Sequence, residues 1–224
     1  GLNLSMIHHI LITHDHADHI KSVGSISDSF NIPVYSTQAV HEGIAKNWCV
    51  KKKVSPNQVR YVEKGKTQQI GDFTVTPFAV PHDSSDCVGY CVQCEGITFT
   101  LVTDCGHVTE EICAFVAKAN YLVIEANHEV EKLMAGPYPL YLKERITSQI
   151  GHLSNAECAR TIVENATENL KHVWLCHLSD ENNHPELARI AVTSLMESYG
   201  LRAGVDFIVE VLRRKIPSEI YDLK

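Results

Sequence analysis

Short apolar runs and longer amphipathic segments alternate along this chain. Runs that alternate with period two, or that are rich in β-branched and aromatic residues, predict strands. Segments whose apolar residues recur every three or four positions predict helices. The expected strands lie near residues 7–13, 33–35, 59–63, 73–80, 87–94, 97–103, 121–125 and 172–176. The expected helices lie near residues 19–29, 37–46, 109–118, 138–147, 155–168 and 185–199.

The order of these elements predicts an α/β fold. Strands followed by helices occur in two similar halves, which suits two sheets packed face to face with helices outside. We therefore expect an αββα four-layer sandwich in a single domain over residues 1–224. Only thirteen residues precede His14, so we expect outer strands of the first sheet to be missing. Such a sheet would have an exposed edge, which favours homo-oligomers.

A segment rich in histidine and aspartate follows the apolar run Ile10-Leu11-Ile12. It extends from His14 to His19 and contains three histidines and two aspartates. Imidazole and carboxylate groups bind divalent metal ions. Residues two apart in an extended segment face the same way, so His14 and His16 can bind one ion, while Asp18 and His19 come where the chain turns into a helix. The segment predicts a two-metal site; a solvated histidine-rich loop is the alternative.

Three further metal-ligand residues stand at the ends of predicted strands: His82, Asp104 and His177. The carboxyl ends of strands are the usual place for sites in α/β folds. For each residue alone, a capped strand end is the alternative. Together with the histidine-rich segment, the three residues are predicted to complete two metal shells, because four ligands are too few for two ions.

The order of these motifs resembles that of the metallo-β-lactamase superfamily over nearly the whole chain. The best-known zinc β-lactamases have cysteine at the bridging position, whereas this chain has aspartate, which suits Zn²⁺ or Mn²⁺ and also Fe. Two divalent metal ions are therefore the expected cofactors, and phosphoester or thioester hydrolysis is expected rather than antibiotic hydrolysis. The resemblance implies one metal ion bound by His14, His16 and His82, another bound by Asp18, His19 and His177, and Asp104 as the bridge between them.

His152 lies in the segment Gly151-His152-Leu153-Ser154-Asn155, just before a predicted helix. Ser154 is expected to cap that helix, with Glu157 completing a capping box. The amino end of a helix favours an anion. In the phosphodiesterase branches of the superfamily, such as tRNase Z and PhnP-like enzymes, a similar element has a catalytic histidine that does not bind metal. The resemblance implies that role for His152; a polar loop histidine is the alternative.

Longer matches resemble the YycJ (WalJ)-type proteins of bacteria, which implies a metal-dependent nuclease, proposed to be a 5′ exonuclease acting on DNA. The matching segments are residues 125–128, 133–139, 142–146, 151–155 and 177–183. Lys143 and Arg145 precede His152 and are predicted to bind phosphate. Ser154 and Asn155 are also predicted to contact the substrate.

The expected reaction is hydrolysis of a phosphodiester, with nucleic acid as the expected substrate. Asp18 is expected to orient the attacking water, and His152 to protonate the leaving oxygen. A small cyclic phosphodiester is an alternative substrate. Thioester or lactone hydrolysis of the glyoxalase II type, which has no need of the element around His152, is a second alternative. A non-catalytic metal-binding module is a third.

Composition agrees with a cytoplasmic hydrolase. The 224 residues are 44% hydrophobic, which suffices for a large core, and no apolar stretch approaches the length of a membrane span. The eight cysteines are expected to be mostly buried thiols in a reducing compartment. The net charge of −7 is unusual for a nuclease, so attraction of the substrate is expected to depend on the bound metal ions.

Overall fold

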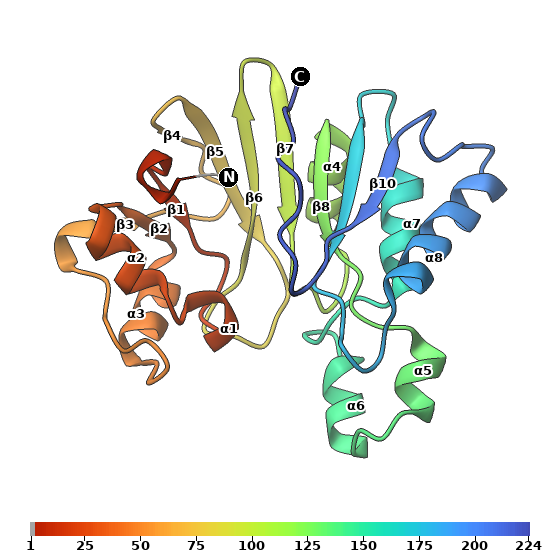
Figure 1. The fold of residues 1–224 in the computed structure, drawn as a ribbon, viewed down its shortest axis with the longest axis horizontal. Coiled ribbons are helices and arrows are strands. Elements are labelled where there is room, and N and C mark those ends of the chain that lie inside the picture. Colours follow the sequence, from red (N-terminus) through yellow and green to blue (C-terminus); the bar gives the residue numbers. More distant parts are fainter. Residues whose placement is uncertain (1–2) are drawn as a thin grey trace. The chain divides into compact units, whose positions relative to one another are not determined.

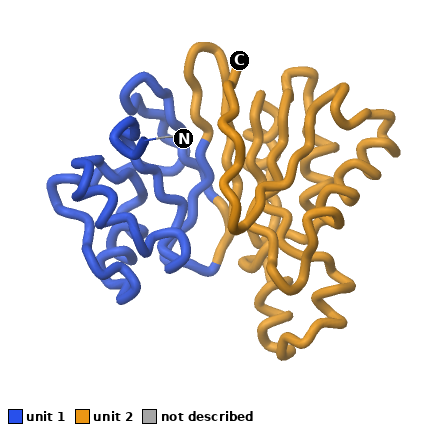
Figure 2. Tube along the Cα trace, in the orientation of Figure 1, with its two compact units in different colours: residues 1–79, 83–90 blue, residues 80–82, 91–224 orange. Residues whose placement is uncertain are grey.

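The computed structural model describes residues 3–224, and the chain divides into two compact units. Unit 1 contains residues 1–79 and 83–90, and unit 2 contains residues 80–82 and 91–224 (Figure 2). The single domain expected over the whole chain stays a prediction.

Unit 1 is built around a small parallel sheet in which β2 is the middle strand (Figure 1). A separate antiparallel pair, β4 and β5, follows it in the chain. The strands are β1 (Ile10–Leu11), β2 (Val34–Ser36), β3 (Val59–Tyr61), β4 (Gln68–Ile70) and β5 (Phe73–Ala79). The helices are the 3-10 turns η1 (Leu4–Met6) and η2 (Pro56–Gln58) and the α-helices α1 (Ala17–Ile20), α2 (Val23–Phe30) and α3 (Gln38–Lys46).

The core of unit 1 explains why the helix expected over residues 19–29 is divided. The chain forms α1 and then α2, with a break at Lys21 and Ser22. Ile20 and Val23, on either side of the break, both enter one apolar cluster with Val34, so tertiary packing favours the interruption. The first strand is also shorter than expected, and β4 was not predicted.

The second sheet is mixed, with the strand order β10-β9-β8-β7-β6-β5-β4. Strands β7 to β10 belong to unit 2 and are parallel to one another, and β6 is divided between the units. In the register, Val102 pairs with Ile124, and Glu125 pairs with Cys176, so β7, β8 and β9 end at the same edge. The strands are β6 (Val88–Cys94), β7 (Ile97–Val102), β8 (Tyr121–Glu125), β9 (His172–Cys176) and β10 (Ile208–Val211). Strand β10 was not predicted.

Within unit 2, helix α7 packs against α4 and α8 (Figure 1). The predicted capping box is confirmed, since the Ser154 side chain accepts from the Glu157 backbone and the Glu157 carboxylate accepts from the Ser154 backbone. Ile162 is buried and Ala156 is exposed, and the helix ends at Asn165 rather than at residue 168. The helices are α4 (Glu110–Lys118), α5 (Val130–Ala135), α6 (Leu140–Ile146), α7 (Asn155–Asn165) and α8 (Pro185–Ser198).

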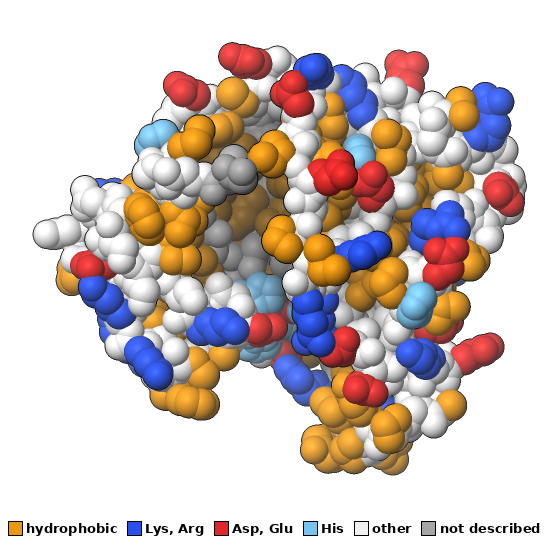
Figure 3. Space-filling model, in the orientation of Figure 1, with side chains coloured by type: hydrophobic (Ala, Val, Ile, Leu, Met, Phe, Trp, Pro, Cys, Tyr) orange, Lys and Arg blue, Asp and Glu red, His pale blue; other side chains and the backbone are white. Residues whose placement is uncertain are grey.

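Helices α5 and α6 contribute little to the core of unit 2, and α5 was not predicted. Leu133 and Ile146 are buried, whereas Met134, Leu140 and Tyr141 are exposed. Figure 3 shows hydrophobic side chains gathered where Figure 1 places these two helices. A short helix is only marginally stable by itself, so α5 and α6 depend on the tertiary contacts of their buried residues, Leu133 and Ile146.

The cysteines agree in part with the expectation of buried thiols. All eight are free; Cys87, Cys91, Cys105 and Cys158 are buried, and the other four are half-buried. Burial raises the pKa of the thiols of Cys105 and Cys176, which keeps them protonated. Among residues 3–224, no helix combines the length and apolar character needed to cross a bilayer.

Burial of α7 predicts that alanine substitutions at two isoleucines lower the stability of the protein by very different amounts. The Ile162→Ala substitution should lower the free energy of unfolding by about 2–5 kcal/mol, because it leaves a cavity in the core. Ile190→Ala on α8 is the matched control, since Ile190 is 45% exposed and Ile162 is 0% exposed. Its cost should stay below about 1 kcal/mol. Urea unfolding measures both, and equal costs would contradict the packing of α7.

Candidate functional site

The histidine-rich segment of unit 1 brings its three imidazoles together. The ring centroid of His14 lies 4.8 Å from that of His16 and 4.2 Å from that of His19. This happens because the strand-like segment ends at His16, which is the N-cap of α1, so the chain turns and presents His19 from the first helical residues. The cluster predicted from the spacing is therefore confirmed within unit 1.

Hydrogen bonds orient the side chains of this segment. The Nε2 atom of His16 lies 3.1 Å from the carbonyl oxygen of Asp83, and a carbonyl can only accept, so Nε2 donates and Nδ1 carries the lone pair. The Asp18 side chain is 70% exposed, with Oδ2 at 3.7 Å from His19 Nε2. Asp15 instead accepts from the backbone and the hydroxyl of Ser85. Asp15 belongs to none of the groups of possible metal ligands among the described residues.

Unit 2 has its own cluster of four residues, Asp104, Glu125, His152 and His177. Each offers one ligand atom, and these atoms all lie within 4.8 Å of one another. Asp104 follows β7, Glu125 ends β8, and His177 follows β9, so the parallel register brings them to one edge of the sheet. The expected meeting of strand-end residues is confirmed for Asp104 and His177 in unit 2.

Glu125 is the residue that the sequence did not single out. Its carboxylate is fully buried and accepts hydrogen bonds from two rings and a backbone amide: His152 Nδ1 at 2.7 Å, His177 Nδ1 at 2.9 Å and Cys105 N at 2.7 Å. Burial raises its pKa, but the hydrogen bonds from His152 and His177 outweigh that effect and lower the pKa to about 2. The sequence feature that could have indicated Glu125 is an acidic residue at the end of an otherwise apolar strand.

These bonds set the tautomers of the imidazoles. Because Glu125 accepts from Nδ1 of His177, the lone pair of that ring lies on Nε2, which is 3.4 Å from Asp104 Oδ1. His82, also in unit 2, donates from Nδ1 to the carbonyl of Gly151 at 3.0 Å, and its Nε2 lies 3.7 Å from the same Asp104 oxygen. Rings oriented in this way by a second acceptor are typical of metal ligands.

The backbone at two of these residues is strained. Asp104 has a φ of 54° and His177 a φ of 53°, in the left-handed region that non-glycine residues rarely adopt. The Thr103 hydroxyl donates to Asp104 Oδ2 at 2.7 Å, and the Asn127 amide donates to the carbonyl of His177 at 3.0 Å. These contacts offset a conformational cost of about 1–3 kcal/mol for each residue.

Two glycines let the loops of unit 2 approach one another closely. A Cβ atom on Gly106 would lie 2.4 Å from the carbonyl oxygen of Gln149, and one on Gly151 would lie 2.2 Å from that of Ile146. The Gly151 carbonyl also binds His82. The turn that precedes His152 is therefore packed directly on the loop that follows Asp104.

The chemistry of both clusters fits divalent metal ions. The carboxylates of Asp104 and Glu125 are buried beside imidazoles, and buried negative charge is costly unless cations or hydrogen bonds compensate it. Imidazole nitrogen with carboxylate oxygen is a donor set for zinc, manganese or iron. The same chemistry applies to the imidazoles of unit 1 with Asp18.

Three of the residues predicted to contact the substrate, Lys143, Ser154 and Asn155, bond to other groups of the protein. Lys143 Nζ donates to the carbonyl of Met134 at 2.7 Å, and Arg145 is exposed in the last turn of α6. Ser154 and Asn155 are buried, Ser154 as the helix cap and Asn155 within a network of amides. Substrate binding by these four residues stays a prediction.

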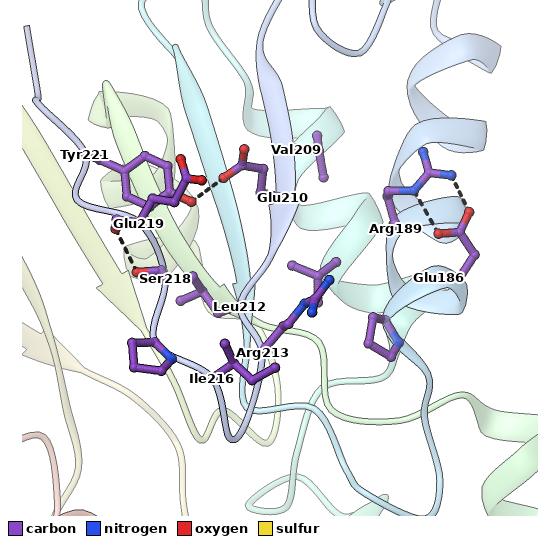
Figure 4. A pocket seen from close by; sticks show the side chains of 13 residues that line it. Glu186, Arg189, Val209, Glu210, Leu212, Arg213, Ile216, Ser218, Glu219 and Tyr221 are labelled. Atoms are coloured by element: carbon purple, nitrogen blue, oxygen red, sulfur yellow. Dashed lines mark hydrogen bonds and ion pairs between the residues drawn. The ribbon is translucent and has the colours of Figure 1, made fainter.

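A cavity of about 560 Å³ lies elsewhere in unit 2, between β10, α8 and the C-terminal residues. Two pairs of side chains that line it are hydrogen-bonded, Arg189 to Glu186 and Tyr221 to Glu210 (Figure 4). None of the predicted site residues lines this cavity.

Comparisons with known proteins identify the family of this chain. Residues 2–177 match the beta-lactamase superfamily domain. The chain is 33% identical over 223 residues to exodeoxyribonuclease YycJ of Bacillus anthracis, which covers 98% of this chain and 82% of that protein.

Two solved structures share the fold at lower sequence identity. The metallo-beta-lactamase fold protein YhfI of Bacillus subtilis has a TM-score of 0.68 and 16% identity, covering 94% of this chain and 76% of that one. Zinc-bound PqqB of Methylobacterium extorquens has a TM-score of 0.64 and 17% identity, covering 92% of this chain and 71% of that one. The expected α/β fold of metallo-β-lactamase type is confirmed, and the chain belongs to the metallo-β-lactamase superfamily of metal-dependent hydrolases.

Proposed function

We propose that this protein hydrolyses phosphodiester bonds in DNA as an exonuclease. The observation that carries the proposal is the contact of His152 Nδ1 with the buried carboxylate of Glu125 at 2.7 Å. A carboxylate in this place stabilises a protonated imidazole, which can then give the proton on Nε2 to a leaving group. The name exodeoxyribonuclease, which the Bacillus anthracis relative carries, supports DNA as the substrate.

In this proposal, the seven ligands implied by the family resemblance bind two divalent metal ions. Bound ions of this kind supply an activated water and stabilise negative charge on the phosphoryl oxygens. Asp18 orients the attacking water. His152 delivers a proton to the departing oxygen, while Glu125 holds the ring in place. The free thiols of the chain support a reducing compartment such as the cytoplasm.

The pair of His152 and Glu125 also favours a phosphodiester over a thioester. A thiolate leaves readily without a proton, whereas the alkoxide released from a sugar–phosphate bond needs one, so a general acid has more effect on the phosphodiester. A small cyclic phosphodiester releases the same kind of leaving group. It is therefore the second candidate substrate.

The first test is an assay on single- and double-stranded DNA, RNA, a cyclic dinucleotide and a thioester, with Mn²⁺ or Zn²⁺ added. We expect mononucleotides from DNA, and loss of this activity with EDTA that added metal restores. Cleavage of the thioester with no cleavage of any phosphodiester would overturn the proposal. Preference for the cyclic dinucleotide would establish the second candidate.

The second test separates proton donation from metal binding. His152→Ala should lower kcat on DNA by about 10²–10⁴-fold and leave the bound metal content unchanged. Asp104→Ala is the contrasting variant, because it should lose both turnover and metal. Metal content is measured by elemental analysis of each purified variant. A His152→Ala protein with full activity on every phosphodiester would refute the role of this histidine.

The third test concerns the charge on Glu125. Its pKa of about 2 in the folded protein lies below the ordinary value of 4.5, so its ionised form stabilises the fold above pH 4.5, and this contribution is lost as the pH falls toward 2. In metal-free protein, the stability difference between wild type and Glu125→Gln should therefore shrink by on the order of 3 kcal/mol over that range. Urea unfolding at successive pH values measures it. If the free energies of unfolding of the two proteins changed equally with pH, the lowered pKa of Glu125 would be contradicted.

A further inference from the structure

Three buried asparagines follow the catalytic and ligand residues of unit 2. Asn127 comes two residues after Glu125, Asn155 three after His152, and Asn183 six after His177; their exposed fractions are 7%, 1% and 3%. Buried amides are costly unless their donors and acceptors are bonded. Here the side-chain amides of all three bond to groups in neighbouring loops.

Asn155 and Asn183 form a reciprocal pair. Asn155 Nδ2 donates to Asn183 Oδ1 at 2.9 Å, and Asn183 Nδ2 donates to Asn155 Oδ1 at 2.8 Å. Asn155 Nδ2 also donates to Glu129 Oε2 at 3.1 Å. The pair joins the start of α7, just after His152, to the loop that follows His177.

The same amides bind the loop that follows Glu125. Asn183 Nδ2 lies 2.8 Å from the carbonyl oxygen of Ala126 and 3.0 Å from that of Asn127. Asn127 in turn donates from Nδ2 to the carbonyl of His177 at 3.0 Å. The segments that follow Glu125, His152 and His177 are thus cross-linked by neutral amides.

We infer that Asn183, paired with Asn155, is a positioning residue that keeps His152 and His177 at hydrogen-bonding distance from Glu125. The inference rests on the proposed function for its effect on catalysis. The Asn183 side chain bonds to Asn155 and to the carbonyls of Ala126 and Asn127, and it acts through the loops that carry the four clustered residues. A neutral amide is required because a carboxylate there would face three oxygen acceptors and would add another buried negative charge near Glu125.

The test is Asn183→Asp, which keeps the size of the side chain and removes its two N–H donors. We expect kcat on a chromogenic phosphodiester to fall by at least about tenfold, while KM changes less than about threefold. The reason is that His152, the proposed proton donor, is misplaced, whereas the residues that bind the substrate are unchanged. Asn155→Asp is the second variant. It removes the N–H donors of the other half of the pair and places a carboxylate beside Glu129 Oε2.

Asn120→Asp is the matched control. Asn120 also ties two loops together, since Oδ1 accepts from Thr98 N at 2.8 Å and Nδ2 donates to Asn169 O at 3.0 Å, but it lies at the opposite end of β8. Its substitution should lower the melting temperature and change kcat less than about twofold. All rates are compared at a temperature where each variant is folded.

A measurement without metal or substrate completes the test. In wild type, the Nδ1 protons of His152 and His177 should give slowly exchanging signals in the proton NMR spectrum, because both are held by buried Glu125. In Asn183→Asp and Asn155→Asp these signals should broaden or disappear, and in Asn120→Asp they should persist. Persistence in the first two variants, or an equal fall of kcat in the control, would overturn the inference. A wild type inactive on phosphodiesters that still showed the NMR difference would overturn only the proposed function.

Discussion

The site of unit 2 depends on one fully buried carboxylate. Glu125 accepts hydrogen bonds from the loops that follow β7 and β9 and from the turn that precedes α7, so a single charge joins segments far apart in the sequence. A buried carboxylate without such donors would cost several kcal/mol. The same bonds leave the metal-binding lone pair of His177 on Nε2 and polarise His152. Stability of the fold and orientation of the catalytic groups thus have a common origin.

The parallel register of β7, β8 and β9 makes this arrangement possible. Because these strands end at one edge, residues just past their ends meet without long loops. Gly106 and Gly151 allow two backbone segments to approach closely, which places the turn before His152 against the loop after Asp104. Regular strand pairing positions the loops, and side-chain hydrogen bonds then set the orientation of each ring.

Much of the site could be predicted from the chain because its residues follow apolar runs. His14, His16 and His19 were found from local spacing, and Asp104 and His177 from their places after strands. Asn127 and Asn183 could not be found in this way, since a buried polar group is justified only by partners distant in sequence. For the same reason Asn155 was predicted as a substrate contact rather than as a partner of Asn183, and Glu125 was not singled out although it ends an apolar strand. Helix α5 and strands β4 and β10 were missed because they are short, and short elements form through tertiary contacts rather than intrinsic preference.

The left-handed backbone at Asp104 and His177 has a consequence for the evolution of this protein. Glycine would relax either position, yet glycine offers no ligand atom, so the residues that best suit the fold and the reaction differ there. Selection for heat resistance alone would favour glycine at these two positions, and the resulting protein would be inactive. A variant of high stability and retained activity would have to gain its stability elsewhere in the chain.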